Sequence, residues 1–230
     1  MLYCFGYSIK NIIKLIAMKK EDLPNKLPVF PLSNFIIFPG TSVPLNIFEP
    51  RYIQMLDHCM SGNRLIGIVQ PKKTGDLKKP DLYNIGCVGK VTSFNETEDG
   101  RYLIVLNGIC RFKITSEIIN KKIFRECVVN FDQYIDDLYK KSEEIKFTDL
   151  NLIFKNLKSL FKKQGYIINW KEIEKQKLDQ TINTLSMASP FSLEEKQILL
   201  ETKNLKIRKE KLEEILKTYV LDNFSNTTLQ

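Results

Sequence analysis

The stretch LPVFPLSNFIIFPGTSVPLNIFEPRY, residues 27–52, decides how the first half of the chain folds. It holds five prolines among Val, Leu, Ile, Phe and Tyr. Val43, Leu45 and Ile47 alternate with other residues, which is typical of a strand, and the proline inside this run favours an edge or barrel strand. The Pro39-Gly40 pair supplies a turn before it.

At Glu49-Pro50 the pattern changes from strand to helix. Proline is favoured at the first position of a helix, because its missing N–H needs no partner there. The apolar residues that follow with helical spacing are Tyr52, Met55, Leu56 and Cys59. Gly62-Asn63 is expected to provide a left-handed stop. The sequence therefore predicts a short helix from about Pro50 to Ser61.

Strand-like segments continue beyond this helix, separated by turn residues. The candidates are residues 64–71, 85–94, 102–108, 109–116 and 123–131, with a polar loop at about 72–80 and with Gly108 dividing the third candidate from the fourth. A closed sheet removes exposed edges. Six or so strands at short spacing with one inserted helix therefore favour a small barrel or a rolled sheet.

The chain changes character near residue 135, where Gly and Pro become rare and the apolar spacing becomes helical. The landmarks are an apolar stripe from 150 to 161 ended by Gly165, N-terminal caps at Asn169 with Glu172 and at Ser192 with Glu195, and a last helix over about 205–221. About four helices are predicted, as a compact helical domain or as a cap packed on the barrel.

The predicted organisation is an N-terminal extension at 1–24, a β-barrel domain at 25–134, a linker at 135–146, a helical domain at 147–222 and a tail at 223–230. Residues 1–17 are mildly apolar but interrupted by polar side chains, and are shorter than the roughly 20 residues of a membrane span. Nothing basic precedes Lys10, unlike in a secretory signal.

We expect translation to start at Met18, with the first 17 residues as a start-site artefact or a loosely ordered extension. A weak amphipathic membrane anchor is the alternative. Neither interpretation predicts stable membrane insertion.

Composition is that of an ordinary folded protein: 230 residues, 43% hydrophobic and 27% charged. The net charge of +8 indicates either a polyanionic partner or a solvated surface rich in lysine, and it forms no arginine-rich stripe. The five cysteines are odd in number and include no C-x-x-C pair. They lie among apolar neighbours, so a reducing cytoplasm is predicted.

Catalytic motifs are scarce in this sequence. His58 is the single histidine, which excludes a multi-histidine metal site within the chain. No phosphate-binding loop and no nucleophile elbow occur, so we predict no catalytic residue, no cofactor and no metal.

Two small groups of residues are candidates for another role. Glu49, Arg51 and Arg111 interrupt apolar surroundings, and we interpret them as a polar junction that ties the short helix to the barrel, with Arg111 meeting Glu49; a ligand site is the alternative. Residues Phe35, Ile36 and Ile37 form an apolar run in a turn-rich segment. If they project outward, they make a peptide-binding patch.

Several motifs in their order and spacing resemble those of one protein family. They are LPVFPL at 27–32, FPG at 38–40, PLNIFEPRY at 44–52, IGIVQP at 66–71, GCVGKV at 86–91 and DGRYLIVLNGICRF at 99–112. The chain closely resembles the amino-terminal domain of Lon proteases, and SLEEKQILLE at 192–201 is similar to the tail of stand-alone bacterial members.

The resemblance covers roughly Leu27 to Leu221. It implies an α+β fold: a PUA-like β-barrel with one inserted short helix, followed by a C-terminal helical bundle. In the full-length protease this region helps to capture unfolded or tagged substrates, while ATP hydrolysis and a Ser-Lys dyad belong to later domains that this sequence lacks.

The resemblance therefore implies a cytoplasmic, non-enzymatic protein that binds unfolded or tagged polypeptides, as an adaptor or a holdase in protein quality control, with a protease or chaperone as a further partner. The alternative from another class is an RNA-binding protein, because PUA-like barrels also recognise RNA and the chain is basic. Fold alone does not decide between them.

Overall fold

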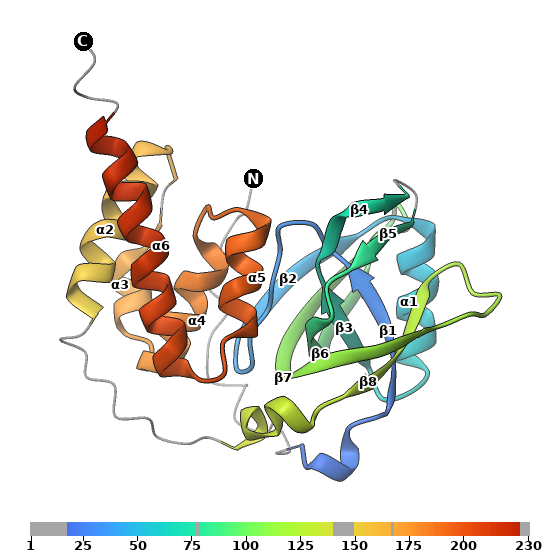
Figure 1. Ribbon diagram of the computed structural model, residues 1–230. Coiled ribbons are helices and arrows are strands. Elements are labelled where there is room, and N and C mark those ends of the chain that lie inside the picture. Colours follow the sequence, from blue (N-terminus) through green and yellow to red (C-terminus); the bar gives the residue numbers. More distant parts are fainter. Residues whose placement is uncertain (1–17, 77–78, 140–149, 167, 226–230) are drawn as a thin grey trace.

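The computed structural model describes residues 18–76, 79–139, 150–166 and 168–225. The predicted start-site segment at 1–17, most of the predicted linker and the end of the predicted tail lie outside these residues. Figure 1 shows the described chain in two adjoining halves, one built of strands with α1 and the other built of helices α2 to α6.

Six strands form the main sheet. They are β1 (Lys26–Pro31), β2 (Ser42–Ile47), β3 (Leu65–Val69), β6 (Ile85–Glu96), β7 (Tyr102–Ile118) and β8 (Arg125–Asn130). Their order is β2-β7-β6-β3-β1-β8, and β8 also pairs with β7. Among the described strands, only β1 and β3 run parallel. The sheet thus curls into a partly closed barrel with β2 outside the ring, which confirms the predicted rolled sheet.

Strand β7 is a single long strand, so the prediction that Gly108 divides two strands is wrong. Its first part pairs with β2 and β6, and its last part pairs with β8. Register shifts near Ser93 and Ile114 mark the bulges that let the sheet bend. A Cβ atom on Gly108 would lie 2.1 Å from the carbonyl oxygen of Phe38. Glycine here therefore permits a close backbone approach.

The polar segment after β3 is a hairpin, where the sequence predicted a loop. Strand β4 (Pro71–Asp76) pairs with β5 (Lys79–Leu82) as a separate two-stranded sheet. Gly75, with φ of +97°, lies in β4 opposite Pro80. An isolated ribbon buries neither face in a core. Its strands therefore lack the apolar alternation by which a strand is found in a sequence.

Helix α1 (Pro50–Met60) confirms the predicted short helix, with Pro50 in its first turn. Tyr52, Met55, Leu56 and Cys59 form its buried face. The expected left-handed stop at Gly62-Asn63 is wrong, because the left-handed residue after the helix is Arg64, with φ of +61°.

The helical half contains five α-helices. They are α2 (Asn151–Lys163), α3 (Trp170–Glu174), α4 (Leu178–Ala188), α5 (Leu193–Glu201) and α6 (Leu205–Ser225), and two 3-10 segments, η2 (Lys20–Asp22) and η3 (Asp132–Leu138), lie in the strand-rich half. Both predicted caps form: Asn169 accepts a hydrogen bond from the backbone of Glu172, and Ser192 and Glu195 make a reciprocal capping box. Among the described residues, no helix is both long and apolar enough to cross a bilayer.

Two apolar clusters fill the interior. One is drawn from five strands, β1, β3, β6, β7 and β8, as expected inside a curled sheet. The other runs from α1 and residues 36–38 into helices α2 to α6 without interruption. The two halves of Figure 1 therefore share a continuous core across their junction.

Strand β2 is an edge of the main sheet. Within the described residues it pairs with β7 alone, and Pro44 lies in its middle, opposite Val105. Proline has no N–H, so this edge offers an interrupted row of donors to any added strand.

Candidate functional site

The predicted peptide-binding patch is part of the core. Ile36 and Ile37 are 2% and 0% exposed, and Phe35 is half-buried against the same apolar cluster. The next residue, Phe38, explains this placement, because its carbonyl meets Gly108 and its ring lies 4.0 Å from the guanidinium carbon of Arg208 on α6. The segment is a wedge between sheet and helices, and the exposed patch proposed at Phe35, Ile36 and Ile37 is a wrong prediction.

The predicted pairing of Arg111 with Glu49 is also wrong. Glu49 accepts a hydrogen bond from Arg51 at 2.9 Å, and both side chains are nearly half exposed at the start of α1. Arg111 lies in β7 with its side chain 3% exposed, and it pairs with Asp137. The three residues therefore belong to two separate ion pairs, one at the surface and one at the junction of the two halves.

Arg111 joins the sheet to α5. Its Nε and Nη2 atoms donate to the two carboxylate oxygens of Asp137 at 2.8 Å, and Nη1 donates to the carbonyl oxygens of Leu200 and Thr202. Burial lowers the pKa of Arg111, but the hydrogen bonds and charge of Asp137 more than offset this, so its pKa lies above the ordinary value. A charged guanidinium thus caps the last carbonyls of α5.

Other polar contacts cross the same junction. Gln70 at the end of β3 donates to the carbonyl of Leu193 and to the side chain of Gln197, each at 3.0 Å. Lys196 donates to the carbonyl of Asn34 at 3.1 Å, and burial lowers the pKa of its amine. These bonds orient α5 on the sheet. The junction is consequently structural, since these bonds link groups of the chain to one another.

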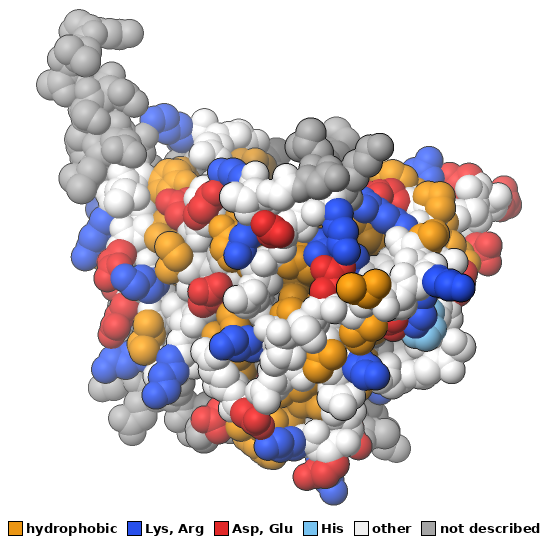
Figure 2. Space-filling model, turned by 45° about the vertical axis from the view of Figure 1, so that its right-hand side comes forward, with side chains coloured by type: hydrophobic (Ala, Val, Ile, Leu, Met, Phe, Trp, Pro, Cys, Tyr) orange, Lys and Arg blue, Asp and Glu red, His pale blue; other side chains and the backbone are white. Residues whose placement is uncertain are grey.

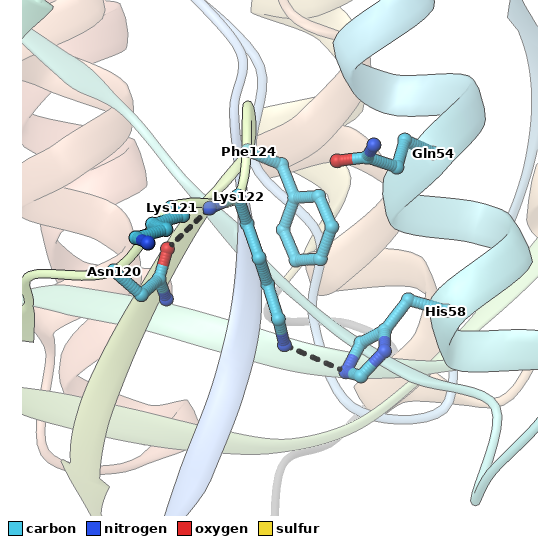
Figure 3. A pocket seen from close by; sticks show the side chains of 6 residues that line it. All are labelled: Gln54, His58, Asn120, Lys121, Lys122 and Phe124. Atoms are coloured by element: carbon cyan, nitrogen blue, oxygen red, sulfur yellow. Dashed lines mark hydrogen bonds between the residues drawn. The ribbon is translucent and has the colours of Figure 1, made fainter.

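A shallow, open pocket with a volume of about 470 Å³ lies on the strand-rich half, on the side away from helices α2 to α6 (Figure 1). Its residues are Gln54 and His58 of α1 and Asn120, Lys121, Lys122 and Phe124 of the turn between β7 and β8. Figure 3 shows the Phe124 ring between the turn and the side chains of Gln54 and His58. We call this feature the α1-turn pocket.

Hydrogen bonds hold the turn against α1. Asn120 accepts a bond from the backbone of Lys122 at 2.9 Å, and Ile123 donates its backbone N–H to Gln54 at 3.4 Å. Lys122 Nζ lies 3.2 Å from His58 Nε2, a contact drawn in Figure 3, and donates to Glu126 at 2.8 Å. The pocket wall is therefore built from side chains that fix one another.

The turn also exposes large apolar side chains. Ile119 is 98% exposed and Ile123 is 57% exposed, on either side of Lys121 and Lys122. Figure 2 shows that orange apolar side chains reach the surface in several places among blue and red charged ones. Singly exposed apolar residues are ordinary, but two aliphatic side chains flanking a basic pair beside a pocket make a mixed binding surface.

Reactive groups are few among the described residues. The four described cysteines are buried, and burial raises the pKa of Cys127 to about 11 and that of Cys59 to about 12. A thiol with so high a pKa is a poor nucleophile at neutral pH. No group of His, Cys, Asp and Glu in the described part of the chain could hold a metal ion.

Sequence reasoning did not find the α1-turn pocket. It treated His58 as an ordinary helix residue, residues 117–122 as a connection between strands and residues 123 and 124 as the start of a strand. One signal was present: Ile119 and Ile123 enclose a short basic segment that has neither Gly nor Pro, which is unusual for a tight turn.

Comparison with known proteins gives matches along most of the chain. The family described as the ATP-dependent protease La (LON) substrate-binding domain matches residues 26–218. Similar curated proteins include Lon protease of Flavobacterium johnsoniae, 27% identical over 199 residues, and Lon protease 2 of Myxococcus xanthus, 26% identical over 208 residues. These alignments cover 83% and 86% of this chain but 24% of each relative, so the chain spans about a quarter of their length.

Two solved structures are similar to the fold. A Lon N-terminal domain protein from Xanthomonas campestris matches with a TM-score of 0.58 and 19% identity, over 84% of this chain and 97% of that one. The N-terminal domain of Mycobacterium avium complex Lon protease matches with a TM-score of 0.57 and 16% identity, over 84% and 98%. Both likenesses confirm the predicted α+β fold. By its match from residue 26 to residue 218, the chain belongs to the family of Lon protease substrate-binding domains.

Proposed function

We propose that this protein binds unfolded or tagged polypeptides and acts, without catalysis of its own, as an adaptor or holdase in protein quality control. The observation that carries the proposal is the family match over residues 26–218, because that family is described by its binding of protease substrates. The match concerns a substrate-binding domain, and the adaptor or holdase role is the part that we propose.

The structure supports a binding role in two ways. The junction between the halves is packed and hydrogen-bonded, which leaves the outer surfaces to receive a partner. The α1-turn pocket then combines basic, amide and apolar side chains on one such surface. We place the protein in the cytoplasm, because its described cysteines are free and buried. We propose a protease or chaperone as its partner, because the matched family is the substrate-binding domain of a protease.

Titration of a fluorescent, permanently unfolded polypeptide tests the proposal. The protein from Met18 onward is added at near-physiological salt, and fluorescence anisotropy is recorded. Saturable binding is expected, and it should weaken when the same polypeptide is folded. Absence of binding to unfolded chains of varied composition would contradict the proposed function.

RNA binding is the second candidate, and the net charge of +8 is the observation that favours it. An excess of single-stranded RNA in the same titration separates the two functions. Binding of RNA through its phosphates weakens steeply with salt. Displacement of the polypeptide by RNA at low salt only would assign the interaction to charge.

A further inference from the structure

We infer that the α1-turn pocket is where a bound polypeptide docks, and that it selects an extended segment in which a carboxylate side chain lies beside aliphatic ones. This inference rests on the proposed function and gives it a location and a chemistry. It is carried by the charge of the pocket wall, by the exposed isoleucines beside it and by the fixed shape of the turn.

The α1-turn pocket is lined by basic side chains. The lining of the pocket contains two lysines and a histidine but no carboxylate. The nearest carboxylate, Glu126, already accepts bonds from Lys122 at 2.8 Å and from Asn120 at 2.6 Å, so its charge is compensated within the turn. Lys121 is exposed and has no ion pair or hydrogen bond of its own. The unmatched charge at this site is therefore positive, and it complements a carboxylate.

Two exposed isoleucines lie beside the pocket. Ile119 and Ile123 present two branched aliphatic side chains beside the lysines, with 98% and 57% of their surfaces open to solvent. Covering them removes apolar area from water, at about 25 cal/mol per Å². A segment that alternates apolar and acidic residues can place its carboxylate near Lys121 and its apolar side chains on the isoleucines.

The aromatic rings of the pocket bear on whether its ligand is a polypeptide or a nucleic acid. Proteins that recognise single strands stack bases on exposed aromatic rings. The phenylalanine ring of this pocket, Phe124, is 4% exposed and is covered by Lys122 and His58, whose side chains lie 5.2 and 5.5 Å from its centre. The other ring, the His58 imidazole, is 48% exposed, but it packs on Phe124 and lies 3.2 Å from Lys122 Nζ. The surface thus offers aliphatic contacts and a cation, and its one partly exposed ring is already engaged with neighbouring side chains.

Hydrogen bonds fix the shape of the turn between β7 and β8. The turn is fixed by Asn120, Lys122 and Glu126 among themselves and by Gln54 of α1 from outside. A preformed site loses little conformational entropy when a ligand binds. The pocket has a volume of about 470 Å³ and is open, so an extended segment can reach it from the surface.

The test compares three labelled peptides that differ only in one residue type. Each alternates leucine and valine with Glu, Gln or Lys, and affinity is measured by anisotropy. The wild-type protein should bind the Glu peptide best and the Lys peptide worst. Lys121→Glu should lower the affinity for the Glu peptide by about threefold to tenfold. It should also reverse the order of affinities, so that the Lys peptide binds best. Lys171→Glu, the same change at another exposed lysine, on α3, should leave the order unchanged.

A second pair of variants tests the apolar contact. The double variant Ile119→Ser with Ile123→Ser should lower the affinity for all three peptides by about tenfold. The control Leu152→Ser replaces a 52% exposed leucine on α2 and should leave these affinities unchanged. All these side chains are exposed, so circular dichroism should report unchanged folding.

The outcomes separate the inference from the proposed function. Binding of unfolded chains that ignores peptide charge and survives the turn variants would overturn the inference and leave the function standing. Failure of the wild type to bind any polypeptide would overturn both. Displacement by RNA that depends on Lys121 would assign the pocket to a polyanion and overturn its assignment to a polypeptide.

Discussion

Gly108 lies where β7 passes against the segment that ends at Phe38. The N–H of Gly40 donates to the carbonyl of Gly108, and the N–H of Gly108 donates to the carbonyl of Thr41, both at 2.9 Å. These bonds bring two backbones together with no room for a side chain, since even a Cβ atom would lie 2.1 Å from an oxygen. The wedge at 35–38 is buried because this single residue lets it come so near.

Gly108→Ala is therefore expected to destabilise the fold strongly. Forcing a methyl group into filled space typically costs about 1–3 kcal/mol, and here the neighbour is rigid backbone. Urea unfolding followed by the fluorescence of Trp170, the single tryptophan, measures the loss. The matched control is Gly62→Ala, whose new Cβ would lie 3.8 Å from its nearest neighbour. Equal stability of the two variants would contradict this account.

Glu117 should give the fold a dependence on acid pH. It accepts bonds from Arg125 and pairs with Lys79; burial opposes its ionisation, but these two cations together prevail and keep its pKa below the ordinary 4.5. The stabilisation is fully present above about pH 4.5 and is lost as the pH falls through the lower folded pKa.

Unfolding at pH 7 and at pH 3 checks this expectation. Wild-type protein should exceed Glu117→Gln in stability at pH 7, and the difference should shrink at pH 3, because below the ordinary pKa of 4.5 the unfolded chain binds a proton at Glu117 more readily than the folded chain does. Glu98→Gln, in the exposed turn before β7, is the control and should differ little from wild type at either pH. A difference that does not change with pH would contradict the role of the charge.

At the scale of elements, α5 is the piece that connects the two halves. Its N-terminus is closed by Ser192 and Glu195, and its C-terminal carbonyls receive Arg111. Glu195 also accepts a hydrogen bond from Tyr219 of α6 at 2.8 Å. A nine-residue helix is marginal alone, so α5 depends on these end contacts.

Removing the cap hydroxyl should therefore weaken the whole protein. Ser192→Ala is expected to cost about 1 kcal/mol, or roughly 2–4 °C in Tm for a chain of this size. Thermal unfolding by circular dichroism measures the change. Ser33→Ala, in an exposed turn, is the control. A Tm equal to that of the control would show that the cap contributes nothing.

Local rules predicted those elements whose residues report their own surroundings. The alternation at Val43, Leu45 and Ile47 and the proline at the start of α1 depend on neighbours in sequence, and both predictions are confirmed. The meeting of Arg111 with Asp137, the burial of Ile37 and the α1-turn pocket depend on segments brought together by folding. No short window of the sequence contains both partners of such a contact. Local sequence patterns therefore could not predict these contacts.

At the scale of the whole molecule, one apolar cluster and one buried ion pair hold both halves together. Arg111 contacts η3 through Asp137 and α5 through two carbonyls, and its guanidinium carbon lies 4.2 Å from the centre of the Tyr134 ring. Loss of this side chain would leave a nearly buried carboxylate without its cation. Such a defect affects sheet and helices at once.

Arg111→Ala should destabilise the protein by about 3–5 kcal/mol, the usual cost of removing one partner of a buried pair. Arg51→Ala removes an exposed pair with Glu49 and should cost about 1 kcal/mol or less. Urea unfolding compares the two variants. If Arg111→Ala fails to fold, Arg111→Lys keeps the charge without the two-pronged contact and should show an intermediate loss. Similar small losses for both arginines would contradict the importance of the junction.

Pro44 in the open edge of β2 has a consequence for the protein's own solubility. An unprotected sheet edge lets other strands add to it and accumulate. Among the described strands, β2 pairs with β7 alone, and proline denies a continuous ladder on its other side. If the protein holds unfolded chains, as we propose, this proline keeps the sheet from becoming a seed for their aggregation.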